Sequence, residues 1–508
     1  MSNHAPLVGA GRMIVTAALA GAVFMQALDS SIANVAIPAI SGDLGVSPTQ
    51  GTWVITSFTV ANAVAVPLTG WLARRFGEVR LFVACVLMFT LASWGCGMSE
   101  NIAMLIACRV LQGAFAGPLI PLSQTLLLSV YPPDKKGSAL AIWSMMVLVG
   151  PVLGPILGGW ITDNVSWPWI FFINVPLGAL CVTMTWRRMR ARESQIVKLP
   201  IDAIGLSLLV VGVSSLQLML DRGRELDWFN STEIVVLGCV AVVSLAAMII
   251  WELGEKHPIV DLHLFRNRNF TMGTLVASLA FMLYFSSVLI VPLFLQTQLG
   301  YTATWAGWAT APTGVLSIML MPFVGRYMYR VDARFFATTS CVVFAFCCFW
   351  RAGFNSDVNF AYVAIPQFLQ GMGTAFMFVP MTAVVLAGLT PDKIASAAGL
   401  SSFVRMLASG FGASITTTYW DRRAAVHHAT LVEHISNYNP TFTETFHAPS
   451  ASTFAGIEQI ISGQAFMLST VELFWFAGWT FLALIPLVWL TKPLGAGAAK
   501  NPPPVMAD

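Results

Sequence analysis

Long apolar runs separated by short polar stretches fill most of this chain. A helix that crosses a membrane needs about 20 mostly apolar residues, and this rule predicts fourteen membrane-spanning helices. Their approximate ranges are 13–36, 52–72, 80–98, 102–128, 138–161, 167–187, 202–220, 232–251, 270–297, 303–325, 334–352, 360–387, 396–420 and 469–491. The pattern therefore predicts an all-α membrane protein.

Composition supports this prediction. The chain has 508 residues, of which 56% are hydrophobic and only 10% are charged, whereas soluble domains carry about 25% charged residues. The eight cysteines all fall within apolar runs, and they show no CxxC spacing. We therefore expect a multi-pass integral membrane protein with neither a disulfide framework nor a metal site.

The distribution of lysine and arginine predicts the orientation, because these residues accumulate on the inner side of a membrane. If both termini are cytoplasmic, the inner loops and tails hold 20 of the 27 basic residues. The outer loops hold 5, among them Arg351, while Arg109 and Arg405 fall within helices. This asymmetry supports an even number of spans, with both termini inside.

An internal repeat divides the chain. Three short matches share one offset of 258 residues: Arg109–Gly113 with Gln367–Gly371, Pro133–Lys135 with Pro391–Lys393, and Ser138–Ala139 with Ser396–Ala397. Parallel repeats of six helices around a central site are typical of major facilitator transporters. The predicted units are a first bundle at 1–195, two inserted helices at 196–262, a second bundle at 263–492 with a polar outer loop at 424–468, and a disordered tail at 493–508.

Asp29 is the least expected residue in the first apolar run. A carboxylate near the middle of a bilayer costs roughly 2.5–3.5 kcal/mol, and such residues usually have a function. Arg109 shares a helix face with Gln112 and Gly113, at spacings of three and four residues. Burial favours a protonated Asp29, whereas a nearby Arg109 would favour the carboxylate. We expect this pair to couple transport to protons; a static ion pair is the structural alternative.

The repeat places this chemistry in one half of the chain. Arg109 aligns with Gln367, and matching Leu28–Ser31 to Tyr284–Ser287 aligns Asp29 with Phe285. Since neither the acid nor the base recurs, ion coupling is expected in the first half.

A glycine and proline motif follows in the fifth predicted helix. Its members are Gly150, Pro151, Gly154, Pro155, Gly158 and Gly159. Glycines four residues apart let another helix approach closely, and the two prolines remove backbone donors. Tight packing alone would explain the glycines, but the added prolines favour a hinge or gate.

A second motif lies in the inner loop near residue 75. Its members are Gly70, Arg74, Arg75, Gly77 and Arg80. The inner-side preference for basic residues explains much of this motif, and a role in closing an inner gate is the sharper hypothesis.

A substrate cavity between the halves would need polar and aromatic side chains. The candidates are Gln112, Gln367, Tyr284, Phe376 and Arg405. Arg405 could attract an anionic substrate, or it could pair with a carbonyl or a phospholipid near the membrane edge.

In these motifs the chain resembles the EmrB/QacA group, the fourteen-span drug:proton antiporters of the major facilitator superfamily. The resemblance covers nearly the whole chain and rests on Leu28–Pro38, Gly70–Arg80, Arg109–Gly117 and Gly150–Gly159. Within the group it is most similar to the EmrB-type members. Arg74 stands where the superfamily usually has an acid, which weakens any charge relay through that loop.

The resemblance implies a multi-pass exporter in the bacterial inner membrane that expels hydrophobic and amphipathic toxic compounds and contributes to antibiotic resistance. Inward proton movement would drive it, with no other cofactor. EmrB-type members work with an EmrA-like periplasmic membrane-fusion adaptor and a TolC-like outer-membrane channel, and segment 424–468 would lie on the side that meets an adaptor.

Other functions fit the sequence less well. An enzyme would need a nucleophile or metal constellation, and the sequence contains no HExxH, no P-loop and no histidine within a predicted helix. We therefore expect neither an enzyme nor a nucleic-acid-binding protein. A narrower exporter, for example of fatty acids, an importer, and a channel or receptor remain as alternatives.

Overall fold

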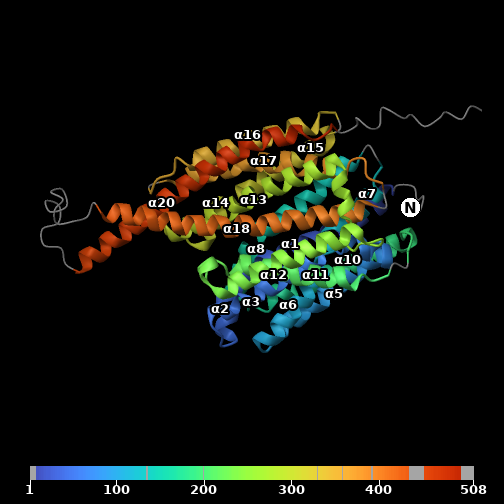
Figure 1. Cartoon of the computed structure of the whole chain (residues 1–508), viewed down its shortest axis with the longest axis horizontal. Helices are drawn as coiled ribbons and strands as arrows, with labels where there is room; N and C mark the ends of the chain where they lie inside the picture. Colours follow the sequence, from blue (N-terminus) through green and yellow to red (C-terminus); the bar gives the residue numbers. More distant parts are fainter. Residues whose placement is uncertain are drawn as a thin grey trace, which may run out of the picture.

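The computed structural model describes residues 7–132, 135–197, 200–328, 330–356, 358–390, 393–433 and 451–493, and it is all-helical over these ranges (Figure 1). The first half contains α1 (Gly9–Asp43), α2 (Pro48–Gly51), α3 (Trp53–Ala65), α4 (Thr69–Phe76), α5 (Glu78–Gly97), α6 (Ile102–Ala116), α7 (Leu119–Val130), α8 (Lys136–Asn164), α9 (Trp169–Phe172) and α10 (Asn174–Met189). The inserted pair is α11 (Ala203–Arg222) and α12 (Thr232–Gly254). The second half contains α13 (Arg268–Thr297), α14 (Ala303–Thr310), α15 (Pro312–Tyr327), α16 (Ala333–Arg351), α17 (Phe360–Leu386), α18 (Ile394–Val432), α20 (Ala451–Ala483) and α21 (Ile485–Trp489).

The predicted number of spans is confirmed. Thirteen helical segments of the described chain are long and apolar enough to cross a membrane, and the bent pair α3 and α4 brings the number to fourteen. The bend of 62° falls at Val66–Leu68, where Pro67 supplies no backbone donor to the helix. Pro118 and Pro312 stand at the similar junctions α6–α7 and α14–α15.

The inserted pair lies along the junction of the two halves. Helix α11 packs against α3 of the first half and α18 of the second, while α12 packs mainly on α11. The outward face of α12 exposes large apolar side chains, including Val242, Val243 and Ile250. A face of this kind is stable in lipid rather than in water.

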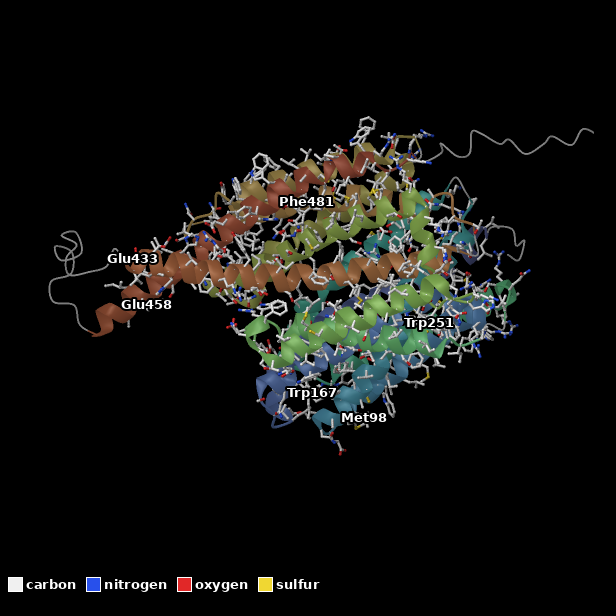
Figure 2. The ribbon with its side chains drawn as sticks, viewed as in Figure 1. Met98, Trp167, Trp251, Glu433, Glu458 and Phe481 are labelled. Atoms are coloured by element: carbon white, nitrogen blue, oxygen red, sulfur yellow. The ribbon has the colours of Figure 1, made fainter. Side chains whose placement is uncertain are left out.

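The bundle has two distinct ends. At the N-terminal end the backbone N–H of Leu7 donates to the carbonyl of Val130, 3.1 Å away, which joins the start of α1 to the end of α7. At the opposite, far end, α18 and α20 project beyond the other helices, and Glu433 and Glu458 lie on this projection (Figure 2).

The prediction of a polar loop at 424–468 is wrong for most of its length. Helix α18 continues to Val432 and α20 begins at Ala451, while 434–450 lie outside the described residues, as does nearly all of the predicted tail, from 494 onward. Charged side chains join the two helices: Arg423 binds Glu472 at 2.7 Å, and His428 contacts Glu458 at 2.8 Å. The described parts of 424–468 are polar because here α18 and α20 extend beyond the other helices of the bundle.

Small residues bring the two halves into close contact at the N-terminal end. A Cβ added to Gly70 of α4 would lie 2.5 Å from the Cα of Ser396 on α18. Gly137 of α8 meets Gly325 of α15 equally closely, and a Cβ on Gly325 would lie 2.6 Å from the Gly137 carbonyl oxygen. This end of the interface is therefore closed.

Candidate functional site

Asp29 and Arg109 form a buried ion pair. Nη1 of Arg109 lies 2.6 Å from Oδ2 of Asp29, and the side chains are 1% and 0% exposed, respectively. Gln112 donates to Asp29 Oδ1 at 2.9 Å and accepts from Arg109 at 2.8 Å. The helical spacing predicted from the sequence that Arg109 and Gln112 share a face, and the structure places both groups on one carboxylate.

Two further side chains complete the site, and sequence reasoning missed both. Asn174, at the start of α10, donates to Asp29 Oδ1 at 2.9 Å and to Ser93 Oγ at 3.0 Å. Ser93 in turn donates to the carbonyl of Phe171 at 2.9 Å. The available signal was a lone amide at the start of an apolar run, which is too common to single out.

Aromatic rings enclose the guanidinium. Arg109 Cζ lies 4.2 Å from the ring centroid of Phe58 and 5.6 Å from that of Phe171, and Arg109 Nε donates to the carbonyl of Val54 at 3.0 Å. Breaking a buried pair of this kind by removing one partner typically costs about 3–5 kcal/mol. The pair therefore holds α1, α3 and α6 together and keeps the Asp29 carboxylate out of water.

The glycine and proline motif of α8 packs directly on the Asp29 segment of α1. A Cβ on Gly150 would lie 2.5 Å from Ala27 Cβ, and one on Gly154 would collide with the hydroxyl of Ser31. Ser31 Oγ also donates to the carbonyl of Gly150 at 3.3 Å. The glycines thus allow an approach that any larger side chain would block.

The prolines of the motif point the other way. Pro151 and Pro155 are exposed, and α8 remains one helix through both. Because proline has no N–H, the carbonyls of Val147 and Pro151 lose their helical donors. The backbone hydrogen bonding of α8 is therefore weakened on its exposed face, at the level where its opposite face contacts α1.

The inner-loop motif lies at the closed N-terminal end. Gly70 makes the contact with Ser396 described above, and Gly77 has φ +89°, a left-handed value that glycine adopts without strain. Glu193, which sequence reasoning missed, accepts from the backbone N–H groups of Val79 and Arg80, both at 2.9 Å. The motif and residues after α10 together fix the start of α5.

A cavity of about 420 Å³ lies between the halves. Helices of both halves and α11 line it, and its wall includes Gln26, Ser30, Phe58, Trp143, Asp221, Phe281, Phe285, Phe378 and Arg405. Asp29 lies behind this wall: its neighbour Ser30 and the Arg109-covering Phe58 face the cavity, while Asp29 itself is fully buried. A movement of α1 or α3 would be needed to expose it.

Of the five residues predicted for the cavity, the structure places only Arg405 in its wall. Gln112 belongs to the Asp29 site, and Phe376 packs on Phe336 with ring centroids 5.3 Å apart. Tyr284 lies behind Phe378, its ring centroid 5.8 Å away. The period of a helix predicts which residues share a face, but not which neighbouring helix covers that face.

Arg351 and Gln367 form a separate buried cluster in the second half. The count of basic residues assigns Arg351 to an outer loop, although it falls at the end of the predicted helix 334–352. In the structure it ends α16 and is 1% exposed. It donates to Ser287 Oγ at 2.8 Å, to Gln367 Oε1 at 3.0 Å and to Gln370 Oε1. Within the described ranges, no carboxylate lies within ion-pair distance of it. Its position beside a polar stretch made it look like a loop residue.

Serines of the two matched segments make similar contacts. Ser31 donates to the carbonyl of Gly150 at 3.3 Å, and Ser286 donates to the carbonyl of Gly412 at 3.2 Å. The segment Tyr284–Ser287 contains no acid, so no carboxylate matches Asp29 whichever of these residues is aligned with it.

Comparisons with known proteins agree with this architecture. The family model of the Major Facilitator Superfamily matches residues 19–413. The multidrug export protein EmrB of Haemophilus influenzae is 51% identical over 96% of this chain and 97% of its own length. The fatty acid resistance protein FarB of Neisseria gonorrhoeae is 50% identical over 97% and 98%. The crystal structure of the human organic anion transporter MFSD10 shares the fold, with a TM-score of 0.57 and 13% identity over 93% of this chain and all of that one.

Proposed function

This chain belongs to the major facilitator superfamily, and on that premise we propose that it is a proton-coupled exporter of hydrophobic and amphipathic compounds in the bacterial inner membrane. Its full-length similarity to a protein named for multidrug export supports this direction of transport. The largely apolar cavity between the halves supports the substrate class.

The observation that carries the proposal is the buried Asp29–Arg109 pair behind the cavity wall. Protonation of Asp29 removes the negative charge that holds Arg109 and weakens the bonds from Gln112 and Asn174. Because Asp29 lies within the stretch of α1 that packs on Gly150 and Gly154, a proton gained or lost there changes the contact between α1 and α8. Proton binding would in this way be converted into helix movement.

The arrangement of the two ends fits an exporter that has closed its inner gate. The halves are in contact at the N-terminal end through Gly70 and Gly137, whereas the cavity wall reaches toward the far end at Asn34, Ile55 and Asp221. With both termini cytoplasmic, this conformation is directed outward. Inward movement of one charge across 100 mV provides about 2.3 kcal/mol toward the cycle.

An adaptor would meet the projecting part of α18 and α20. This helical pair extends beyond the far end of the bundle (Figures 1 and 2) and exposes Glu433 and Glu458. In the proposed orientation it stands in the periplasm, where an EmrA-like adaptor would bind and connect to a TolC-like channel. The similarity to FarB supports fatty acids as one part of the substrate range.

The test uses inverted membrane vesicles with an acid interior and a fluorescent hydrophobic dye. Asp29→Asn keeps the size of the side chain but cannot release a proton, so dye accumulation should fall to the passive level. Asp43→Asn is the matched control, because Asp43 lies on the same helix but binds Trp167 at its far end. Full accumulation by Asp29→Asn would refute proton coupling at this site.

A further inference from the structure

Two opposite charges line the central cavity, and neither comes from the first half. Of the described residues in the wall, Arg405 of α18 is the one cation and Asp221 of α11 is the one carboxylate. The first half contributes only neutral side chains to the wall. Its buried charges, Asp29 and Arg109, lie behind the wall and neutralise each other. Charge recognition in the cavity is therefore separate from the proposed proton site.

Arg405 has no charged partner among the residues that the structure describes. Its Nη2 donates to Ser402 Oγ at 3.1 Å, one turn earlier on the same helix, and its Cζ lies 5.9 Å from the ring centroid of Phe281. Within the described ranges, no carboxylate lies within 4.0 Å of its guanidinium nitrogens. A cation in a low-dielectric site is costly unless a counter-charge is supplied.

We propose that Arg405 binds the acidic group of amphipathic organic anions, such as a carboxylate on an aliphatic or aromatic body. A guanidinium has a planar fork of donors that matches a carboxylate, and Ser402 occupies only part of it. The apolar wall, including Phe281, Phe378 and Trp143, accommodates the body of the molecule. This inference rests on the proposed export function and specifies its substrate class.

Asp221 makes the charge distribution in the cavity wall asymmetric. It lies near the C-terminal end of α11 and accepts from Gln217 Nε2 at 3.0 Å. It also lines two further hollows, one with Arg224 and Asp421 and one with Trp53 and Arg222. A bound anion is repelled from Asp221 and attracted to Arg405. The inserted helix thus contributes to orienting the substrate, in addition to its contacts with both halves.

The experiment measures equilibrium binding by calorimetry to the full-length detergent-solubilised protein. The probes are 1-naphthylacetate and its neutral amide, which share one aromatic body. Arg405→Gln should weaken naphthylacetate binding about ten- to a hundredfold, the expected loss of a charge-assisted contact, and change amide binding less than about twofold. Arg405→Lys should restore part of the loss, because it retains the charge but not the fork.

Asp221→Asn is the matched control, since it removes the other charge of the same wall; it should bind naphthylacetate as well as or better than the wild type. Unchanged naphthylacetate binding by Arg405→Gln would overturn the proposal. So would an equal loss of both probes that Arg405→Lys does not reverse. The two proposals fail separately, because binding to the solubilised protein is measured without a proton gradient. A loss of naphthylacetate binding in Arg405→Gln can therefore be observed whether or not vesicle transport by Asp29→Asn supports the proposed function.

Discussion

Each half of the molecule buries one arginine against a glutamine, but in the part of the chain that the structure describes only the first half places an acid beside it. Gln112 and Gln370 are equivalent in the repeat, and each accepts from a guanidinium, of Arg109 and Arg351 respectively. Arg109 comes from the same helix as its glutamine, whereas Arg351 comes from α16. In the first half the thiol of Cys96 contacts Gln112 at 3.7 Å, so Arg351 occupies the place of Cys96.

The difference separates two uses of a buried charge. In the proposed function, Asp29 exchanges a proton beside the fixed positive charge of Arg109. Arg351 is held by Ser287, Gln367 and Gln370, all of them neutral. Among the described residues no carboxylate contacts it, so we expect this cluster to hold helices together and to take no part in the proposed proton cycle. The comparison predicts unequal effects for matched substitutions.

The largest effect is expected for Arg109→Gln. It should abolish proton-driven dye accumulation and lower the free energy of unfolding by about 3–5 kcal/mol, because it leaves the Asp29 carboxylate buried without its counter-charge. Vesicle transport and thermal unfolding in detergent measure the two parts. Normal transport by this variant would mean that the ion pair is only structural.

Arg351→Gln should have a smaller and different effect. It removes hydrogen bonds to three neutral partners, so we expect a loss of about 1–3 kcal/mol in the free energy of unfolding. Transport per folded molecule should stay within about threefold of the wild type. If transport falls as far as in Arg109→Gln, the two halves share the coupling and the comparison fails.

The smallest effect is expected for Ser287→Asp, which brings a carboxylate to Arg351. The attraction and the cost of burying the new charge should nearly cancel, which leaves stability within about 1 kcal/mol of the wild type. In the double variant Asp29→Asn with Ser287→Asp, transport should remain at the passive level. Rescue there would show that an acid in either half suffices and that position does not matter.

The sequence predicted the number of spans and singled out Asp29 and Arg109 for physical reasons, while their role in proton coupling stays a prediction. A lipid environment requires long apolar helices, so their number can be counted directly. An acid inside such a run is costly enough to be conspicuous, and the spacing of Arg109 and Gln112 placed both on one helix face. Asn174 and Ser93 carried no comparable signal, because single amides and hydroxyls are frequent in membrane helices.

The sequence by itself determined what each helix is: its apolar length, its polar face, and the duplication that gives two similar halves. Only the tertiary structure decided which faces meet. It paired Asp29 with Arg109, covered Gln112 and Tyr284 while leaving Arg405 in the cavity wall, and moved Arg351 from an expected loop into the protein interior. The physical reason is that burial of a charged or polar group depends on the helix packed against it, and that neighbour comes from a distant part of the chain.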